Sequence, residues 1–339
     1  MREKKKVLGL SFGQKMANCE ILVKEALLKC QEQGMEIEFI RANDLYIHPC
    51  TGCTSCVISL ASCRGSGKCI HSTKDDFPIL EDAIFSADAV IVACPTFVLG
   101  PTGLFRTVVD RFGPSHDITF AIPAIEAGKK EGRDPSTYPD ERILKKRVAA
   151  LISVGGAVTE NWLSQNLPGM YGFIEPMGLN VVDKYEYFGA MEWNSCLGRP
   201  ELIERMDLLG QNVVDALNAD TEDERVRYRS ERTGVCPVCH EKQVTIIGKG
   251  NIVECPICGI EGTLDIVNGE IQVTFSVQQQ NRSRLNDEGK WEHSNEIRHG
   301  AMNQKKVPDL TELKKKYIGV GEKNRRNSCY FRKETLSEV

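Results

Sequence analysis

The sequence predicts an α/β fold in which a doubly wound, five-stranded parallel sheet is followed by a small cysteine-rich β module. Three observations lead to this prediction. Apolar runs alternate with helical patterns through the first two thirds of the chain, nine of the fourteen cysteines fall into two clusters, and no apolar run approaches the ~20 residues of a membrane span. The length of 339 residues suits about two globular units.

The predicted strands are apolar runs bounded by turn or helix signals, at residues 7–11, 36–42, 89–95, 148–155 and 180–188. Side chains at helical spacing predict helices between and after them, at residues 17–33, 76–86, 103–112, 159–170 and 199–219. This alternation predicts the strand order 2-1-3-4-5 with helices on both faces of the sheet.

The predicted sheet domain spans residues 1–219. Within it, residues 114–146 contain Pro123, Pro135 and Pro139 and are polar through residues 128–140, so we expect an insertion over one edge of the sheet and a candidate lid. A charged linker (220–233), the cysteine module (234–275) and a charged tail (276–339) follow. The tail has 14 Lys and Arg residues against 9 Asp and Glu, which predicts contact with the acidic body of its own chain or of a partner chain.

Composition also restricts the location and the partners. Fourteen cysteines in a chain of this length favour metal binding or catalysis in a reducing compartment over structural disulfides. The basic start resembles the first part of a signal peptide, but the apolar run after it is too short, so we expect a cytoplasmic protein that does not enter a membrane. The cysteine module has two lysines against five acidic residues, which disfavours nucleic-acid binding.

The first strand runs through a short polar loop directly into a helix. Ser11, Gly13, Lys15 and Asn18 place a hydroxyl, a flexible backbone, a cation and an amide near the positive end of that helix, which suits a phosphate. The loop lacks both the three-glycine dinucleotide pattern and the Walker pattern, so a mononucleotide is predicted. An ordinary tight turn is the alternative.

Two further loops end at the same edge of the predicted sheet. Residues 94–103 supply small residues and one aromatic ring, Phe97, and residues 153–157 supply Gly155 and Gly156. Backbone amides and small side chains at the ends of central strands suit a flat heteroaromatic ring. The three loops therefore predict one crevice for a nucleotide with such a ring.

These features resemble the flavodoxin-like NADPH-dependent FMN reductase superfamily, and most closely its iron-sulfur flavoprotein branch. The resemblance covers roughly residues 5–215 and rests on residues 9–11 with Lys15, residues 18–20, residues 95–97 and the pair Asp110-Arg111. The phosphate loop is one residue shorter than the usual Ser-Gly-Ser-Pro-Arg pattern. The resemblance implies non-covalent FMN held by Ser11, Gly13, Lys15, Asn18, Cys19, Pro95, Thr96, Phe97, Val98, Gly100, Gly155 and Gly156.

The first cysteine cluster has three thiols at intervals of three residues: Cys50, Cys53 and Cys56. Three such thiolates can hold three corners of a cuboidal cluster, so a [4Fe-4S] cluster is predicted. In the iron-sulfur flavoproteins a fourth cysteine follows a Gly-Lys pair and precedes two aspartates, which implies Cys69 as the fourth ligand, with Cys63 as the alternative. A cysteine-rich loop without a cluster is the remaining interpretation.

The second cysteine cluster consists of two Cys-Pro-x-Cys motifs, Cys236 with Cys239 and Cys255 with Cys258. Two such knuckles supply four thiolates to one tetrahedral ion, so zinc is predicted, with a rubredoxin-like iron as the alternative. We expect His240 to be a solvated neighbour. Dimerisation or a structural cap is the expected role of this zinc-ribbon-like module.

The resemblance implies an FMN-dependent oxidoreductase that reduces a small substrate or oxidant, with electrons relayed between the cluster and FMN. Ferredoxin or NAD(P)H is the implied donor, and a homo-oligomer, dimer or tetramer, the implied assembly. An electron carrier without its own substrate and a metal-dependent redox sensor are the alternatives. No catalytic residue is predicted. Six aromatic residues could line a substrate pocket, although core packing explains them equally well: Trp162, Tyr171, Phe173, Tyr185, Tyr187 and Trp193.

Overall fold

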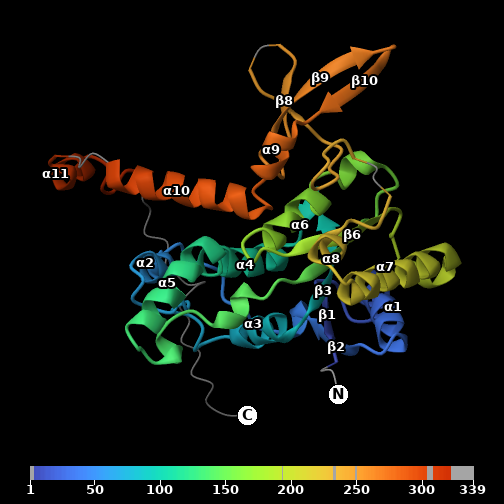
Figure 1. The fold of residues 1–339 in the computed structure, drawn as a ribbon, viewed down its shortest axis with the longest axis horizontal. Helices are drawn as coiled ribbons and strands as arrows, with labels where there is room; N and C mark the ends of the chain where they lie inside the picture. Colours follow the sequence, from blue (N-terminus) through green and yellow to red (C-terminus); the bar gives the residue numbers. More distant parts are fainter. Residues whose placement is uncertain (1–3, 193, 232–233, 249, 304–307, 322–339) are drawn as a thin grey trace. The chain divides into compact units, whose positions relative to one another are not determined.

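The fold is that of a computed structural model, which describes residues 4–192, 194–231, 234–248, 250–303 and 308–321. The chain divides into two compact units that meet between Asn295 and Glu296. The larger unit contains both sheets, and the described part of the smaller unit contains the end of one helix and α11 (Leu310–Lys315). Figure 1 shows the elements in sequence colours.

The main sheet has the predicted strand order. Five parallel strands lie side by side in the order β2 (Glu36–Arg41), β1 (Lys6–Ser11), β3 (Ala89–Phe97), β5 (Val148–Val154) and β6 (Asn180–Tyr187). A two-residue strand, β4 (Gly100–Pro101), pairs antiparallel with the end of β3. All seven residues of β5 are buried, as expected for a central strand covered on both faces.

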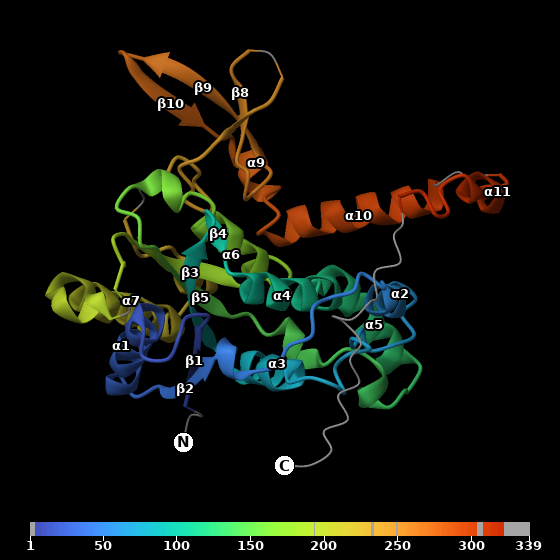
Figure 2. The ribbon, with the colours of Figure 1, turned by 180° about the vertical axis from the view of Figure 1, so that it is seen from behind.

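Helices cover both faces of this sheet (Figures 1 and 2). One face packs against α1 (Asn18–Glu32) and α7 (Pro200–Asn218). The other packs against α3 (Phe77–Ser86), α4 (Gly103–Phe112) and α6 (Asn166–Ile174). In β1, a Cβ on Gly9 would come within 2.5 Å of Leu27 in α1, so glycine allows this helix to approach the sheet closely.

The predicted helix at residues 159–170 is wrong in its first half. The structure has a short 3-10 turn, η5 (Glu160–Trp162), and α6 begins only at Asn166. Pro168 lies in the first turn of α6, where a proline is tolerated, whereas in a longer helix its ring would clash with the carbonyl of Ser164. That carbonyl instead accepts a hydrogen bond from Gln243 Nε2 at 2.5 Å.

The insertion at residues 114–146 is largely helical. It contains η2 (Gly113–Ser115) at its start, α5 (Ile118–Lys130), η3 (Pro135–Thr137) and η4 (Glu141–Leu144). Apolar residues of α5 pack against α2 (Ser55–Ala61), which carries Leu60, and against Phe85 of α3. The insertion therefore supports the first cysteine segment, and none of its residues lines the cleft described below.

A second, antiparallel sheet has the order β10 (Glu270–Thr274), β9 (Glu261–Val267), β8 (Ile252–Glu254) and β7 (Thr245–Ile246). The four cysteines of the second cluster, expected in a separate module, lie in the turns next to this sheet. They belong to the same buried apolar cluster as the residues of α6 that pack on the main sheet. Further helices complete the described chain: η1 (Ala42–Asp44), η6 (Ser195–Gly198), α8 (Glu222–Val226), α9 (Val277–Asn281) and α10 (Asp287–Asn303). Within the larger unit, Lys290 of α10 donates to the carbonyl of Glu175. No helix in the described ranges is long and apolar enough to span a bilayer.

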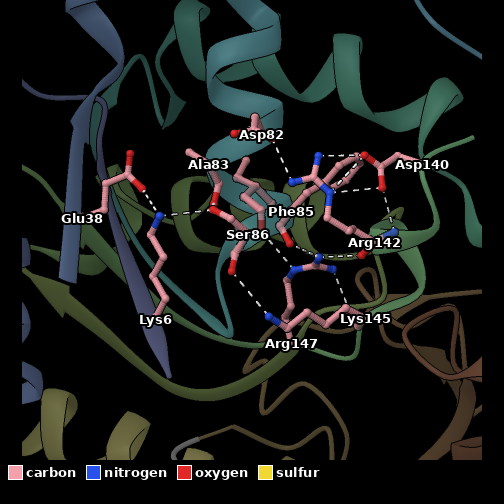
Figure 3. A network of polar contacts seen from close by, with 11 residues as sticks. Lys6, Glu38, Asp82, Ala83, Phe85, Ser86, Asp140, Arg142, Lys145 and Arg147 are labelled. Carbon is pink, nitrogen blue, oxygen red and sulfur yellow. Dashed lines mark hydrogen bonds and ion pairs between the residues drawn. The ribbon is translucent and has the colours of Figure 1, made fainter. Parts of the chain in front are cut away.

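Arg147 joins α3 to the segment that precedes β5 (Figure 3). Its fully buried guanidinium donates to the carbonyls of Ile84 (3.0 Å), Phe85 (2.8 Å) and Ala87 (3.2 Å) at the end of α3, and to those of Arg142 and Lys145. Burial lowers the pKa of Arg147 to about 10. The side chain thus satisfies carbonyls that the end of a helix leaves without partners.

Arg147→Met is expected to lower the free energy of unfolding by roughly 2–4 kcal/mol, because it removes charged hydrogen bonds from buried carbonyls. Chemical denaturation measures this change. Arg142→Met is the matched control, since the ion pairs of that half-exposed side chain with Asp82 and Asp140 lie at the surface, and roughly 1 kcal/mol or less is expected. Equal losses in the two variants would contradict the assigned role of Arg147.

Candidate functional site

A cleft lies at the carboxyl ends of β1, β3 and β5. The chain leaves the sheet in opposite directions on the two sides of the β1/β3 boundary, and such switch points form ligand crevices in doubly wound folds. The volume of 520 Å³ falls within the ~300–1,000 Å³ range of small-molecule sites. The cleft is lined by Phe12, Gly13, Gln14, Ala17, Asn18, Cys19, Asn43, Pro95, Thr96, Phe97, Thr102, Leu104, Val154, Gly155, Gly156, Ala190 and Met191.

The structure brings eight of the twelve predicted FMN residues to this cleft: Gly13, Asn18, Cys19, Pro95, Thr96, Phe97, Gly155 and Gly156. The other four lie elsewhere. Ser11 is fully buried and its hydroxyl oxygen accepts the amide of Gly13 at 3.2 Å. Lys15 is exposed, Val98 is 98% exposed at the tip of a turn, and Gly100 belongs to β4.

The loop between β1 and α1 is fixed by backbone and side-chain hydrogen bonds. Phe12 donates its amide to the carbonyl of Ala93 at 2.9 Å, and Asn43 Nδ2 donates to the carbonyl of Gly13 at 3.1 Å. Because α1 begins at Asn18, the first amides of the helix have no partner within the helix. This end of the cleft can therefore bind an anion through backbone groups.

A buried carboxylate stabilises the same loop. Glu20 accepts hydrogen bonds from Lys24 Nζ (2.6 Å), Arg41 (3.0 Å) and the amide of Met16 (3.2 Å). Burial opposes ionisation of Glu20, but the hydrogen bonds from Lys24 and Met16 and the charges of Lys24 and Arg41 outweigh it, so its pKa lies below the usual value. Arg41 also pairs with Asp44, so two carboxylates balance the two cations, and the group fixes the loop without adding net charge to it.

Asn18 has a role that its position in the sequence does not reveal. Its Nδ2 donates to the carbonyl of Glu192 at 2.6 Å, and its Oδ1 accepts the amide of Cys196 at 3.0 Å. The side chain therefore holds Glu192 and Cys196 against the start of α1. Since Ala190 and Met191 line the cleft, Asn18 shapes the cleft through this segment.

The β3–β4 hairpin forms one side of the cleft. Thr96 pairs with Pro101 and Phe97 with Gly100, while Val98 and Leu99 form the turn with φ angles of 48° and 72°. A left-handed φ is strained for valine, and α6 holds the turn in place, because Gln165 donates its amide to the carbonyl of Leu99 at 3.1 Å. Phe97, 65% exposed, forms an apolar part of the opening.

Nine lining residues were not predicted: Phe12, Gln14, Ala17, Asn43, Thr102, Leu104, Val154, Ala190 and Met191. Thr102 does have a local signal, because a threonine before a helical pattern is a typical N-cap, and its hydroxyl oxygen accepts the amide of Phe105 at 3.2 Å. Asn43 and Met191 have none, since tertiary hydrogen bonds bring their segments to the cleft.

The six aromatic residues proposed for a substrate pocket do not gather at the cleft. Tyr171, Phe173 and Tyr187 are buried in the core, and Trp162 is 60% exposed outside the lining. Tyr185 lines a different cavity of 460 Å³ between β6 and the second cysteine cluster. Trp193 lies outside the described residues. The aromatic side chains that line the cleft are those of Phe12 and Phe97.

The first cysteine segment begins at a buried clamp. Arg111 forms a fully buried ion pair with Asp75 and donates to the carbonyl of His48 at 2.9 Å, and Asp75 accepts the amide of His48 at 2.9 Å. Asp76 and Tyr46 exchange two further bonds of 2.8 Å. The Asp75-Asp76 and Asp110-Arg111 motifs of the sequence thus include the residues that fix the segment to α3 and α4.

The cysteines of this segment differ in their surroundings. Burial raises the pKa of Cys56, and the charges of Cys69 and Cys50 raise it further. Among the described residues, only the four cysteines of the second cluster have sulfurs within 4.8 Å of one another, so the structure does not bring Cys50, Cys53, Cys56 and Cys69 together to that degree. Cys50 and Cys53 are exposed. Cys63 instead packs against the apolar cluster of Leu60, Phe120 and Ala124.

The four cysteines of the second cluster meet at one point. Their buried sulfurs lie within 4.8 Å of one another, with 3.7 Å between the sulfurs of Cys236 and Cys258 and 3.5 Å between those of Cys239 and Cys255. A tetrahedral ion with metal–sulfur bonds of ~2.3 Å would separate its ligands by about 3.8 Å. The thiol arrangement therefore fits one four-coordinate metal ion.

The two knuckles have matching backbones. The amides of His240 and Gly259 donate to the carbonyls of Cys236 and Cys255, and both residues adopt left-handed φ angles of 57° and 67°. The expectation that His240 is solvated is wrong, because it is 4% exposed and its ring lies 4.0 Å from that of Tyr228. A position within the knuckle turn accounts for its burial.

The second cluster is bonded directly to the main sheet. Tyr171 of α6 donates its hydroxyl to the carbonyl of Cys239 at 2.9 Å, and Lys184 of β6 donates to the carbonyls of Cys239 (3.1 Å) and His240 (2.8 Å). Burial lowers the pKa of Lys184, while nearby negative charges oppose this effect. The turn that carries Cys239 and His240 is therefore part of the core that also contains α6.

Several known proteins are similar to this chain in sequence or fold. Flavone synthase cfoJ of Aspergillus candidus is 28% identical over 320 residues, which cover 93% of this chain and 95% of that protein. An iron-sulfur flavoprotein of Methanosarcina thermophila is 24% identical over 190 residues, 56% of this chain and 83% of that protein. The solved structure of a flavone reductase has a TM-score of 0.75 and 27% identity, covering 92% of this chain and 96% of that chain. A family model for NADPH-dependent FMN reductase matches residues 6–186, more than half of the sequence, and the chain belongs to that family.

Proposed function

We propose that this protein binds FMN in the cleft and reduces a small, planar, conjugated acceptor. The observation that carries the proposal is the combination, within one cleft, of an anion-binding loop at the start of α1 and an apolar opening formed by Phe97, Leu104 and Met191. The anion-binding loop alone would indicate only a phosphate site, and the apolar opening alone would indicate only a hydrophobic pocket. Together they suit a ligand with a phosphate at one end and a flat ring at the other.

The residues of the cleft fit FMN. Residues 12–18 would hold the phosphate through backbone amides, and residues 95–97 and 155–156 would contact the ring. A Cβ on Gly155 would come within 2.4 Å of Leu163, so glycine allows this loop to pack closely beside the cleft. Bound FMN supplies hydride and single-electron transfer, which lets either NAD(P)H or a ferredoxin act as donor.

The acceptor class follows from the opening and from the relatives. Phe97 and Met191 are 65% and 81% exposed, and apolar groups at a cleft opening favour a flat, apolar molecule. One full-length relative is named for forming a flavone and the other for reducing one. We therefore propose a conjugated aromatic ketone as the acceptor.

The purified protein is expected to bind one FMN per chain and to bind riboflavin at least about tenfold more weakly, because riboflavin lacks the phosphate. Fluorescence titration measures both affinities. With NADH or NADPH as donor, reduction of a flavone should be visible as loss of flavone absorbance. Absence of FMN binding would refute the proposal. Equal affinities for FMN and riboflavin would show that the loop before α1 does not bind the phosphate.

Met191→Asp provides the variant for the acceptor side. It places a carboxylate at the apolar opening and should raise the KM for the flavone about tenfold while FMN stays bound. Val158→Asp is the matched control, because Val158 is 77% exposed but does not line the cleft. If both variants raise the KM equally, the opening does not contact the acceptor.

We further propose a [4Fe-4S] cluster on Cys50, Cys53, Cys56 and Cys69. The buried clamp that fixes the segment and the similarity to iron-sulfur flavoproteins support it. Packing of Cys63 against Leu60 favours Cys69 as the fourth ligand. In a homo-oligomer, which we also propose, the cluster of one subunit would serve the FMN of another.

Cys53→Ala is expected to abolish acid-labile sulfide and most bound iron, whereas Cys63→Ala should retain both, because Cys63 packs in an apolar cluster. FMN content should be unchanged in both variants. Iron and sulfide analysis after anaerobic purification measures the outcome. If Cys63→Ala loses its sulfide, Cys63 and not Cys69 is the fourth ligand. If anaerobically purified wild-type protein contains no sulfide, the proposal of an iron-sulfur cluster is refuted.

We propose zinc as the ion of the second cysteine cluster, because four thiolates complete its tetrahedral shell. The double variant Cys236→Ser with Cys239→Ser is expected to lower zinc from one per chain to none. It should also lower the melting temperature and weaken FMN binding, because α6 contacts both the knuckle and the cleft hairpin. Elemental analysis, thermal unfolding and FMN titration measure these effects.

Cys30→Ala is the control, since Cys30 is a fully buried cysteine of the α1 side, outside both clusters. It should keep its zinc. If the wild-type protein is coloured and contains one iron in this site, the ion is a rubredoxin-like iron and not zinc. If the double variant lacks zinc but binds FMN with unchanged affinity, the knuckle does not influence the cleft.

A further inference from the structure

Asn166 is a fully buried amide at the start of α6. Its Nδ2 lies 3.1 Å from the carbonyl oxygen of Cys94, 2.8 Å from Thr96 Oγ1 and 2.9 Å from Ser153 Oγ. Cys94 and Thr96 belong to β3 and Ser153 to β5, so this one amide joins the ends of the two strands. Its Oδ1 is buried and has no hydrogen-bond partner within the described part of the chain.

The chemistry of these groups determines the direction of each hydrogen bond. The carbonyl of Cys94 can only accept, so the atom of Asn166 that faces it must be the amide nitrogen. That nitrogen donates and cannot accept. Its two protons are shared among three oxygens, and neither the Thr96 nor the Ser153 hydroxyl can donate to it, so the proton of each hydroxyl must point elsewhere.

The two hydroxyls differ in what surrounds them. Ser153 is fully buried, whereas Thr96 is half-buried and lines the cleft. The hydroxyl proton of Thr96 is therefore available to a ligand in the cleft. This arrangement is fixed before any ligand arrives, because Asn166 is held within the core.

We propose that Asn166 is a positioning residue that makes the Thr96 hydroxyl a hydrogen-bond donor toward the cleft. The proposal rests on the proposed FMN site and assigns the donor a ligand of defined chemistry, a carbonyl oxygen or a ring nitrogen that can accept. Both FMN and a conjugated ketone carry such atoms, and separate measurements of each ligand distinguish them.

Asn166→Asp tests the direction of the bond with almost no change in shape. A carboxylate in place of the amide accepts the Thr96 proton and withdraws it from the cleft. Thr96→Val removes the hydroxyl, whereas Thr96→Ser keeps a hydroxyl and should behave like the wild type. Ser153→Ala is the matched control, because it removes the other hydroxyl partner of Asn166, which does not line the cleft.

The measurements are the FMN dissociation constant, the flavin absorption spectrum, and kcat and KM for a flavone. Thr96→Val and Asn166→Asp should each weaken one ligand about fivefold to tenfold, which corresponds to one lost hydrogen bond. The ligand whose binding is weakened, FMN or the flavone, is the one that accepts the hydrogen bond from Thr96. The double variant should be no weaker than either single variant, because both remove the same donor.

The outcome separates this proposal from the proposed function. If the wild type binds FMN and reduces the flavone while Thr96→Val matches Thr96→Ser in every measurement, Thr96 is not a donor and the inference is overturned. Additive effects of the two substitutions overturn the role of Asn166. If the wild type does not bind FMN, the proposed function fails and the inference fails with it. Should Asn166→Asp not fold, the comparison of Thr96→Val with Thr96→Ser decides.

Discussion

The amide of Asn166 attaches α6 to the carboxyl ends of β3 and β5, the neighbouring strands that border the cleft. The hairpin that follows β3 contains Val98 at a φ of 48°, a conformation that costs about 1–3 kcal/mol for a residue of this kind. Such a turn persists only where its surroundings hold it. The amide of Gln165 bonds the carbonyl of Leu99, and Gly169 approaches Pro101 so closely that a Cβ would come within 2.8 Å of it. The first turns of α6 therefore determine where Phe97 lies.

The opposite side of α6 connects the cleft to the second cysteine cluster. Tyr171 and Lys184 together donate three hydrogen bonds to the carbonyls of Cys239 and His240. The half-buried ammonium of Lys184 and the buried phenol of Tyr171 need such partners, so a change in the knuckle would leave both polar groups unsatisfied next to α6. An appended module with its own core would have no such requirement. The contacts explain why residues 1–295 form one compact unit and why the knuckle is expected to affect the flavin site.

The sequence predicts those parts of the molecule whose signals are local. Central strands that are buried on both faces appear as continuous apolar runs, so β3 and β5 were found within two residues of their observed ends. Spacing within each Cys-Pro-x-Cys motif likewise predicts the metal site. Asn43 and Met191 were missed because long-range bonds from Asn43 to Gly13 and from Asn18 to Glu192 bring their segments to the cleft. Lys15 shows the opposite case, because its charge suggested a phosphate contact while its exposed side chain lies outside the lining.

The clamp beside the first cysteine segment shows how an exposed loop can be held in a fixed geometry. A buried ion pair such as Arg111 with Asp75 contributes little net stability, because desolvation offsets much of the attraction. Its directional bonds, however, hold both the amide and the carbonyl of His48, two residues before Cys50. The ring of His48 stacks on that of His71 at 4.0 Å, two residues after Cys69, so the two ends of the segment are held together. A segment that must present thiolates at fixed positions benefits from such constraints at its ends, while in its middle Leu60 of α2 packs against Phe120 and Ala124 of α5.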